Sequence, residues 1–211
     1  MNKTWKFIFN KYGLPEIHKK LSSEEIDSLP KGYPTVLKEY LEVYGLSTLN
    51  NGAFQICLPD KFTFIAEEIR EFLKVYELGE IYIYAHSAFD AVYFWTQNYG
   101  TGTLELSRNE LFFESLYKEE ELVELTALTP FRSGIEGAEV YDDEEGEELY
   151  LRSLEKYGKL NYGECYGFFP AVAFGGEENL ENIRVTNAQA HYAMLVQSQD
   201  ITMLRLVIEE K

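Results

Sequence analysis

Cysteine and histidine are the residues of this chain whose chemistry suits nucleophilic catalysis. Cys165 lies in an apolar, glycine-rich run, and His191 lies in an apolar segment further along the chain. A hydrolytic enzyme built on them would require the thiol, the imidazole and an acid to converge in one cleft. A cysteine in an apolar run is otherwise a small core residue. We expect the core role and no catalytic site, and the thiol–imidazole pair stays open as the alternative.

The sequence shows no spacing that is typical of a metal or nucleotide site. The three histidines belong to no Glu-x-x-His or His-Glu-x-x-His motif, and the two cysteines form no CxxC motif. The acidic run at residues 142–148 lacks the spacing of a calcium loop. No Walker loop, nucleophile elbow or dinucleotide glycine motif is present. We therefore expect no metal and no cofactor.

Two acidic segments are the candidate binding residues. The members of both are Asp142, Asp143, Glu144, Glu145, Glu147, Glu148, Glu177 and Glu178. Such carboxylates can pair with the arginine and lysine side chains of a partner protein. Carboxylates near the start of a helix also offset its dipole and then need no partner. We take these residues as the predicted partner-contact surface, with the helix-start role as the alternative.

The composition limits the classes of partner. The chain has 211 residues and a formal net charge of −17, from 36 acidic and 19 basic side chains. Such a field repels nucleic acid and anionic lipid and attracts cationic partners. No signal peptide or membrane-spanning run is visible. We expect a protein located in the cytoplasm, with no direct nucleic-acid binding and no membrane contact.

The elements that must position these residues begin with helices. Ser22 and Glu25 form a capping box after an N-terminal arm, and Gly45 ends a second helix that starts near Pro34. A turn at residues 50–52 leads into a short strand at 53–57. The spacing of apolar residues then predicts a helix from a cap at Asp60 to Gly79.

A sheet and a second set of helices follow. Residues 81–85, 91–96 and 103–106 predict a β-meander, because they are rich in β-branched and aromatic residues. Ser107 and Glu110 predict a capping box that opens a helix through Leu116. Further helices are expected at 150–157 and 186–197, the latter with Ala190, Ala193, Met194, Val196 and Gln197 near its buried side. Residues 201–208 fit a strand or a helix tail.

We expect an α+β fold, with helices packed on an antiparallel meander sheet and a smaller C-terminal α+β lobe. The predicted division is a first lobe at 1–118, a connecting segment at 119–141 and a C-terminal lobe at 142–211.

Two blocks of sequence resemble the GAD-like family of bacterial proteins. The more specific block is Tyr162-Gly-Glu-Cys-Tyr-Gly-Phe-Phe-Pro-Ala171, followed by Gly175-Gly-Glu177 and Glu178-Asn-Leu180. The other comprises Leu29-Pro30, the helix Leu37–Gly45, Asn51-Gly-Ala-Phe54 and Pro59-Asp-Lys-Phe62. A similar helix–glycine–strand order occurs more distantly in SMI/KNR4-like immunity domains. The segment His86-Ser-Ala-Phe-Asp90 departs from the Phe-Gly-Asp of the family.

The resemblance implies binding and not catalysis. Many GAD-like proteins are immunity proteins for type VI secretion toxins, so it implies a non-catalytic immunity protein that neutralises a co-encoded toxin, often a nuclease. A nuclease binds phosphate in a basic cleft, and an acidic partner can be steered into that cleft. The alternative is a small-molecule or peptide-binding regulatory module with an aromatic pocket among Tyr82, Tyr84, Tyr93, Phe94 and Trp95.

Overall fold

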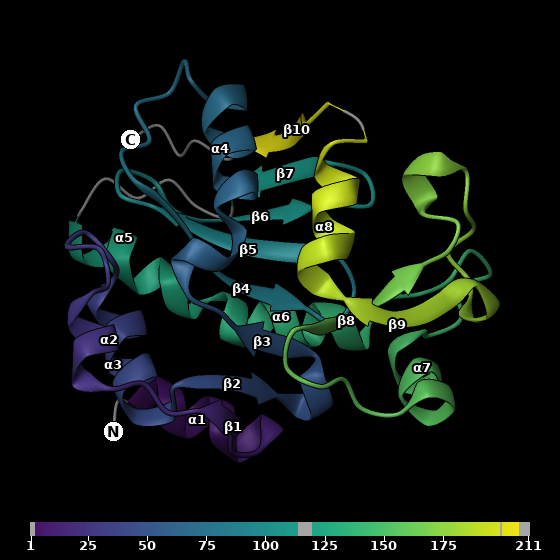
Figure 1. Cartoon of the computed structure of the whole chain (residues 1–211), viewed down its shortest axis with the longest axis horizontal. Coiled ribbons are helices and arrows are strands. Elements are labelled where there is room, and N and C mark those ends of the chain that lie inside the picture. Colours follow the sequence, from purple (N-terminus) through teal and green to yellow (C-terminus); the bar gives the residue numbers. More distant parts are fainter. Residues whose placement is uncertain (1–2, 114–119, 199, 207–211) are drawn as a thin grey trace.

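The computed structural model describes residues 3–113, 120–198 and 200–206, and its centre is an eight-stranded sheet (Figure 1). The strands of this sheet are β1 (Glu16–Lys19), β2 (Leu46–Leu49), β3 (Phe54–Ile56), β4 (Ile81–Ser87), β5 (Ala91–Thr96), β6 (Gly100–Glu105), β7 (Glu110–Phe113) and β10 (Thr202–Leu206). A separate two-stranded sheet pairs β8 (Glu164–Phe168) with β9 (Ile183–Asn187).

The helices lie between and after these strands. They are α1 (Lys3–Tyr12), α2 (Ser23–Asp27), α3 (Thr35–Tyr44), α4 (Thr63–Phe72), α5 (Glu120–Leu125), α6 (Pro130–Glu139), α7 (Tyr150–Tyr157) and α8 (Ala188–Val196). Short 3₁₀ turns occupy η1 (Asn50–Gly52), η2 (Pro59–Phe62), η3 (Thr126–Leu128), η4 (Val172–Phe174) and η5 (Leu180–Asn182).

The large sheet is an antiparallel meander with one parallel addition. Strands β1 to β7 pair in sequence order, each antiparallel to the next, and β10 pairs in parallel with β7. The predicted α+β class and meander are confirmed. The undecided segment at 201–208 forms a strand as far as Leu206, and residues 207 and 208 lie outside the described residues.

Helices cover both faces of this sheet (Figure 1). Successive side chains of a strand point to opposite faces. On β5, Tyr93 and Trp95 therefore join the core beneath α1, α3 and α6, whereas Val92 and Phe94 join the core beneath α4 and α8. The sheet is thus the middle of three layers, and its edge strand β1 is exposed.

The C-terminal hairpin β8–β9 packs against the end of the sheet where β4 turns into β5. The backbone N–H of Tyr166 donates to the carbonyl of Ala88 at 2.7 Å. The Gln55 side chain donates to the carbonyl of Glu164 at 2.7 Å and accepts from the N–H of Gly163 at 2.8 Å. The hairpin side chains join both cores of the large sheet.

The segment 119–141, expected to connect two lobes, contains packed helices. Phe131, Ile135 and Ala138 of α6 are buried in the core against β3 and β4. Helix α6 therefore forms part of one wall of the sheet, and it also borders the candidate site. The division of the chain into separately folding units remains a prediction.

Two predicted elements were wrong, one in type and one in length. The helix from Ser107 is the strand β7, because Asn109 adopts a left-handed φ of +49° and turns the chain into a hairpin that pairs Glu105 with Glu110. Leu116 of that prediction lies outside the described residues. The helix expected from Asp60 to Gly79 is shorter: α4 follows the turn η2 and ends at Phe72.

The buried face predicted for α8 was wrong at Ala190, Met194 and Gln197 and right at Val196. Ala190 and Met194 are exposed and Ala193 is half-buried, whereas His191, Tyr192 and Leu195 face the core. The helix is apolar on most sides, so hydrophobic periodicity did not identify its inner face. The helix that begins at the capping box of Ser22 with Glu25 and the helix predicted from near Pro34 to Gly45 are both confirmed.

Candidate partner-binding site

The predicted acidic run folds into a tight turn before α7. A backbone bridge pairs Asp142 with Glu148. The Asp143 carboxylate lies inside the turn, where it accepts the N–H groups of Glu145 at 3.0 Å and Glu147 at 2.9 Å. Arg152 donates to the same carboxylate at 2.6 Å, which lowers the pKa of Asp143. Asp143 therefore holds the turn together.

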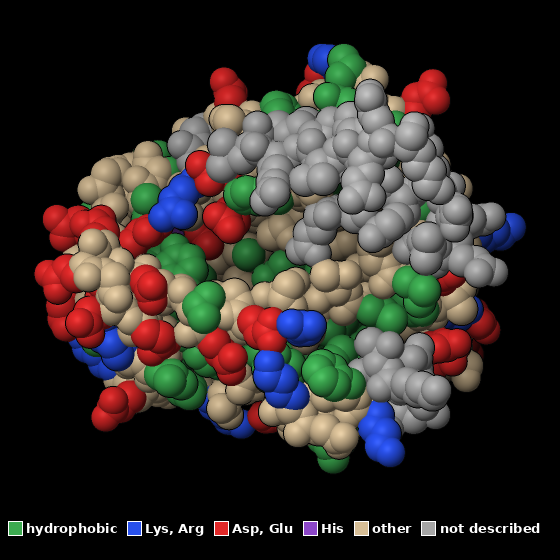
Figure 2. Space-filling view, turned by 180° about the vertical axis from the view of Figure 1, so that it is seen from behind, with side chains coloured by type: hydrophobic (Ala, Val, Ile, Leu, Met, Phe, Trp, Pro, Cys, Tyr) green, Lys and Arg blue, Asp and Glu red, His purple; other side chains and the backbone are tan. Residues whose placement is uncertain are grey.

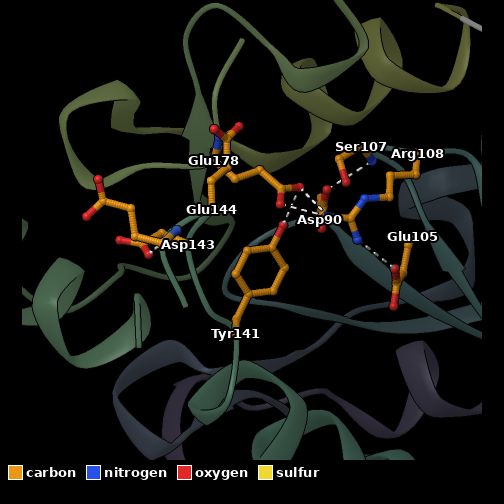
Figure 3. Close-up of polar contacts among 9 residues, drawn as sticks. Asp90, Glu105, Ser107, Arg108, Tyr141, Asp143, Glu144 and Glu178 are labelled. Carbon is orange, nitrogen blue, oxygen red and sulfur yellow. Dashed lines mark hydrogen bonds and ion pairs between the residues drawn. The ribbon is translucent and has the colours of Figure 1, made fainter. Parts of the chain in front are cut away.

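The second acidic segment lies against this turn. The N–H of Glu144 donates to the carbonyl of Glu178 at 3.2 Å, and the N–H of Glu178 donates to the Glu144 carboxylate at 3.1 Å (Figure 3). The fold thus brings together two segments that the sequence predicted separately.

The eight predicted residues differ in exposure. Glu178 and Asp143 are buried, and Glu148 is half-buried and accepts the N–H of Leu151 at 2.7 Å in the first turn of α7. The exposed members are Asp142, Glu144, Glu145, Glu147 and Glu177. Figure 2 shows acidic side chains gathered at this end of the molecule. We name these five residues the acidic surface.

A polar network around the buried Glu178 carboxylate adjoins the acidic surface. Arg108 donates to both oxygens of Glu178 at 2.8 and 2.7 Å, and the Tyr141 hydroxyl donates to Glu178 at 3.1 Å (Figure 3). The Glu178 side chain is only 10% exposed. Its charge is therefore compensated by a guanidinium and a phenol.

Two further carboxylates adjoin Arg108. Asp90 is buried and accepts the N–H of Ser107 at 2.9 Å, and burial raises its pKa. Glu105 lies 3.9 Å from Arg108. Burial, with repulsion from Asp90, raises the pKa of Glu105 to about 7. The group holds more negative charge than Arg108 compensates.

A cavity of ≈ 580 Å³ opens beside these carboxylates. Its walls come from the β4–β5 turn, the faces of β5, β6 and β7, the last turns of α6, and Tyr141. Figure 2 shows this face hollowed near its centre, with hydrophobic side chains inside the hollow. The described lining includes Asp90 and Glu105 and contains no lysine, arginine or histidine.

The proposed pair of Cys165 and His191 does not form. Cys165 is fully buried against Tyr192, and burial raises the pKa of its thiol. His191 instead packs on the ring of Phe169 at 5.4 Å between centroids. Among the described residues, no hydrogen bond joins Cys165 to His191. The Tyr192 hydroxyl donates to the carbonyl of Phe89 at 2.7 Å, which fixes this part of the core.

Two further properties bear on the site. In the part of the chain that the structure describes, no group of three or more His, Cys, Asp or Glu side chains is arranged to hold a metal ion. Within the same residues, no helix has the length and apolar character needed to cross a bilayer.

The aromatic residues that the alternative function required are mostly core residues. Tyr82 and Trp95 stack on each other, and Tyr84 and Phe94 are fully buried. Of that set, Tyr93 alone lines the cavity. The other site residues, Asp90, Glu105, Arg108 and Tyr141, were not identified from the sequence.

The order of the strands could have identified two of these residues, Asp90 and Arg108. In a meander, alternate turns lie at the same end of the sheet. The β4–β5 turn with Asp90 and the β6–β7 turn with Arg108 therefore meet, once β7 is recognised as a strand. The false helix prediction at Ser107 concealed this.

Comparison with known proteins places this architecture in a class of bacterial immunity domains. The family model for the GAD-like domain matches residues 3–108, half of the chain, and a second model, T6SS immunity protein Tdi1, C-terminal, matches residues 125–198. The chain belongs to the GAD-like family, of the type VI secretion immunity type. The resemblance seen in the sequence is confirmed.

One solved structure extends the likeness over nearly the whole fold. The crystal structure of Atu4351 from Agrobacterium tumefaciens is similar with a TM-score of 0.76 and 21% sequence identity, covering 94% of this chain and 91% of that one. At this identity the likeness concerns the fold. No curated protein matches the sequence at a significant level.

Proposed function

We propose that this protein is a non-catalytic immunity protein that binds and neutralises a co-encoded secreted toxin, and that the toxin is a nuclease. The family supplies the immunity role. The acidic surface is the observation that supports direct binding. Its five carboxylates converge from two chain segments that hydrogen bond to each other.

The electrostatics suit a basic partner. A nuclease binds phosphate through arginine and lysine, and carboxylates pair with the same side chains. The net charge of −17 attracts such a cleft over a long range. Asp143 and Glu178 hold the surface in shape from inside, and we leave them out of the proposed contact. We place the complex in the cytoplasm of the producing cell.

The experiment uses the secreted product of the adjacent gene as the toxin. An inactive variant of that product is titrated into the purified protein by calorimetry, and the active toxin is assayed on DNA and RNA with and without the protein. We expect a stoichiometric complex and loss of nuclease activity. An active toxin and no complex at low salt would refute the immunity role, and a complex with a toxin that cleaves neither nucleic acid would refute the nuclease assignment.

A further inference from the structure

The floor of the cavity behind the acidic surface is the part of the sheet face that lies beside α6. Helix α6 packs on β3 and β4. The floor continues across β5, β6 and β7, where Tyr93, Thr103 and Phe112 are cross-strand neighbours. The next row of the same face holds Ala91 opposite Glu105. The floor is thus aromatic at one end and carboxylate at the other.

The carboxylate end has an uncompensated charge. Arg108 is committed to Glu178 at 2.7 Å, and its distance to Glu105 is 3.9 Å. Asp90 and Glu105 both line the cavity, and no basic side chain does so among the described residues. A cationic group entering the cavity would meet two carboxylates and no basic side chain of the described lining.

We propose that this cavity receives an arginine side chain of the toxin, whose guanidinium pairs with Glu105 and Asp90 and stacks on the aromatic floor. This inference rests on the proposed function. A guanidinium suits the site better than an ammonium because it is planar, binds carboxylate through two parallel hydrogen bonds and stacks on aromatic rings.

A protein partner suits the position of the cavity better than a free metabolite does. Tyr141 lines the cavity and directly precedes Asp142 of the acidic surface. Glu178 compensates Arg108 behind the cavity and directly follows Glu177 of the same surface. The cavity and the acidic surface are therefore neighbours, and one basic surface can engage both. A buried anchor within a wider charged surface is the usual arrangement of a binding hot spot.

Protonation of Glu105 makes the affinity of the pocket for a guanidinium depend on pH. With a pKa of about 7, about a tenth of this carboxyl is ionised at pH 6 and about nine tenths at pH 8. The charged groups around it are Asp90, Glu110 and Glu178, which disfavour ionisation, and Arg108, which favours it. An incoming guanidinium binds the ionised form, so affinity rises with pH across this range.

Two matched pairs of variants test the pocket. Gly137 lines the cavity on α6, and a Cβ added there meets nothing within 4 Å, so Gly137→Phe is chosen to place a ring in the cavity. Val140→Phe adds a ring at an exposed position of the same helix end, outside the lining. Glu105→Gln removes the pocket charge, and Glu67→Gln removes an exposed charge from α4, on the other face of the sheet.

The readout is the dissociation constant for the inactive toxin by calorimetry at pH 6 and pH 8, with thermal melts of every variant. We expect Gly137→Phe and Glu105→Gln each to weaken binding at least tenfold at pH 8, and both controls to stay within twofold. Glu105→Gln should also remove most of the pH dependence.

The outcomes separate the two proposals. If the wild type binds the toxin and the dissociation constants of all four variants are within twofold of its value, the arginine pocket is overturned. The proposed immunity role is then unaffected. No binding by wild type overturns the immunity role, and the pocket proposal falls with it. If the pocket variants weaken binding, the surface arginines of the toxin are then substituted one at a time. We expect one toxin variant for which Glu105→Gln no longer changes the dissociation constant. Absence of such an arginine overturns the assignment of the occupant.

Discussion

Arg108 and Glu178 are bonded through two hydrogen bonds of 2.8 and 2.7 Å across 70 residues of sequence. Arg108 is the last residue of the GAD-like match, and Glu178 lies within the match to the Tdi1 C-terminal domain. The bond therefore joins the two recognised regions. It also places the cavity, whose walls come from both regions, beside the acidic surface.

Removal of Arg108 alone should destabilise the fold. Arg108→Gln leaves the Glu178 carboxylate, which is 10% exposed, with the Tyr141 hydroxyl as its remaining side-chain donor among the described residues. We expect a loss of about 1–2 kcal/mol in the free energy of unfolding, because an uncompensated buried charge is left behind. The measurement is urea denaturation at pH 7.5.

The double variant distinguishes this cause from a general loss of packing. Arg108→Gln with Glu178→Gln removes both charges, so it should be more stable than Arg108→Gln alone. The exposed pair Lys74–Glu71 is the control, since Lys74→Gln should change stability by less than about 0.5 kcal/mol. A double variant less stable than the single one would contradict the charge argument.

Glu105 should make the protein less stable as the pH rises. Its pKa is about 7 in the folded protein and about 4.3 in an unfolded chain. Between these values the unfolded state has released the proton and the folded state has kept it, so stability falls across that window. The side chain is 37% exposed, and after a discount for solvent screening the effect is about 1–2 kcal/mol.

Glu105→Gln removes this effect and should gain stability over wild type between pH 5 and pH 8.5. Urea denaturation of the variant and the wild type at pH 5 and at pH 8.5 measures the gain in the free energy of unfolding. If the variant and the wild type differ by the same free energy at both pH values, the pKa of Glu105 is not raised in the folded protein. Since the variant is expected to be stable, a loss of toxin binding by it could not be attributed to unfolding.

Substitution by alanine should lower the stability of the protein at one glycine and raise it at another. Gly176 of the glycine-rich run donates to the carbonyl of Ala171 at 3.0 Å, and a Cβ there would overlap the backbone of Pro170. Gly176→Ala should cost about 1–3 kcal/mol, because the loop must open. Gly137 lies exposed in α6 with free space at Cβ, and Gly137→Ala should gain about 0.5–1 kcal/mol through helix propensity. Thermal melts that rank the two variants in the reverse order would contradict this.

The meander and several helices were predictable because their signals are local. The capping box at Ser22, the stop at Gly45 and the aromatic strand at 91–96 each follow from a few neighbouring residues. The acidic turn was also visible as a run of charge. Its contact with residues 177 and 178 was not, because long-range packing decides it.

The cavity and its carboxylates were not predictable for the same reason. Ser107 and Glu110 have the pattern of a capping box, but Asn109 turns the chain and the burial of Leu111 and Phe113 selects a strand. Tertiary packing outweighed the local pattern. Without that strand, nothing in the sequence places Arg108 near Asp90 or Glu178.

The acidic surface should control how fast the toxin binds. Four of its carboxylates are neutralised by the variant Asp142→Asn, Glu145→Gln, Glu147→Gln and Glu177→Gln, which spares Glu144 because it accepts the N–H of Glu178. We expect the association rate at low salt to fall about tenfold and its salt dependence to weaken, with the dissociation rate within about twofold, because exposed charges act mainly on diffusional encounter. Stopped-flow kinetics with the inactive toxin at several salt concentrations measure both rates.

The matched control removes the same charge from a different place. Glu67→Gln, Glu68→Gln, Glu77→Gln and Glu80→Gln neutralise four exposed carboxylates on and after α4. If steering depended only on net charge, this control would slow association as much as the first variant does. A decrease specific to residues 142–177 instead locates the encounter at the acidic surface, because the field of an exposed charge is screened beyond about 10 Å at 0.1 M salt.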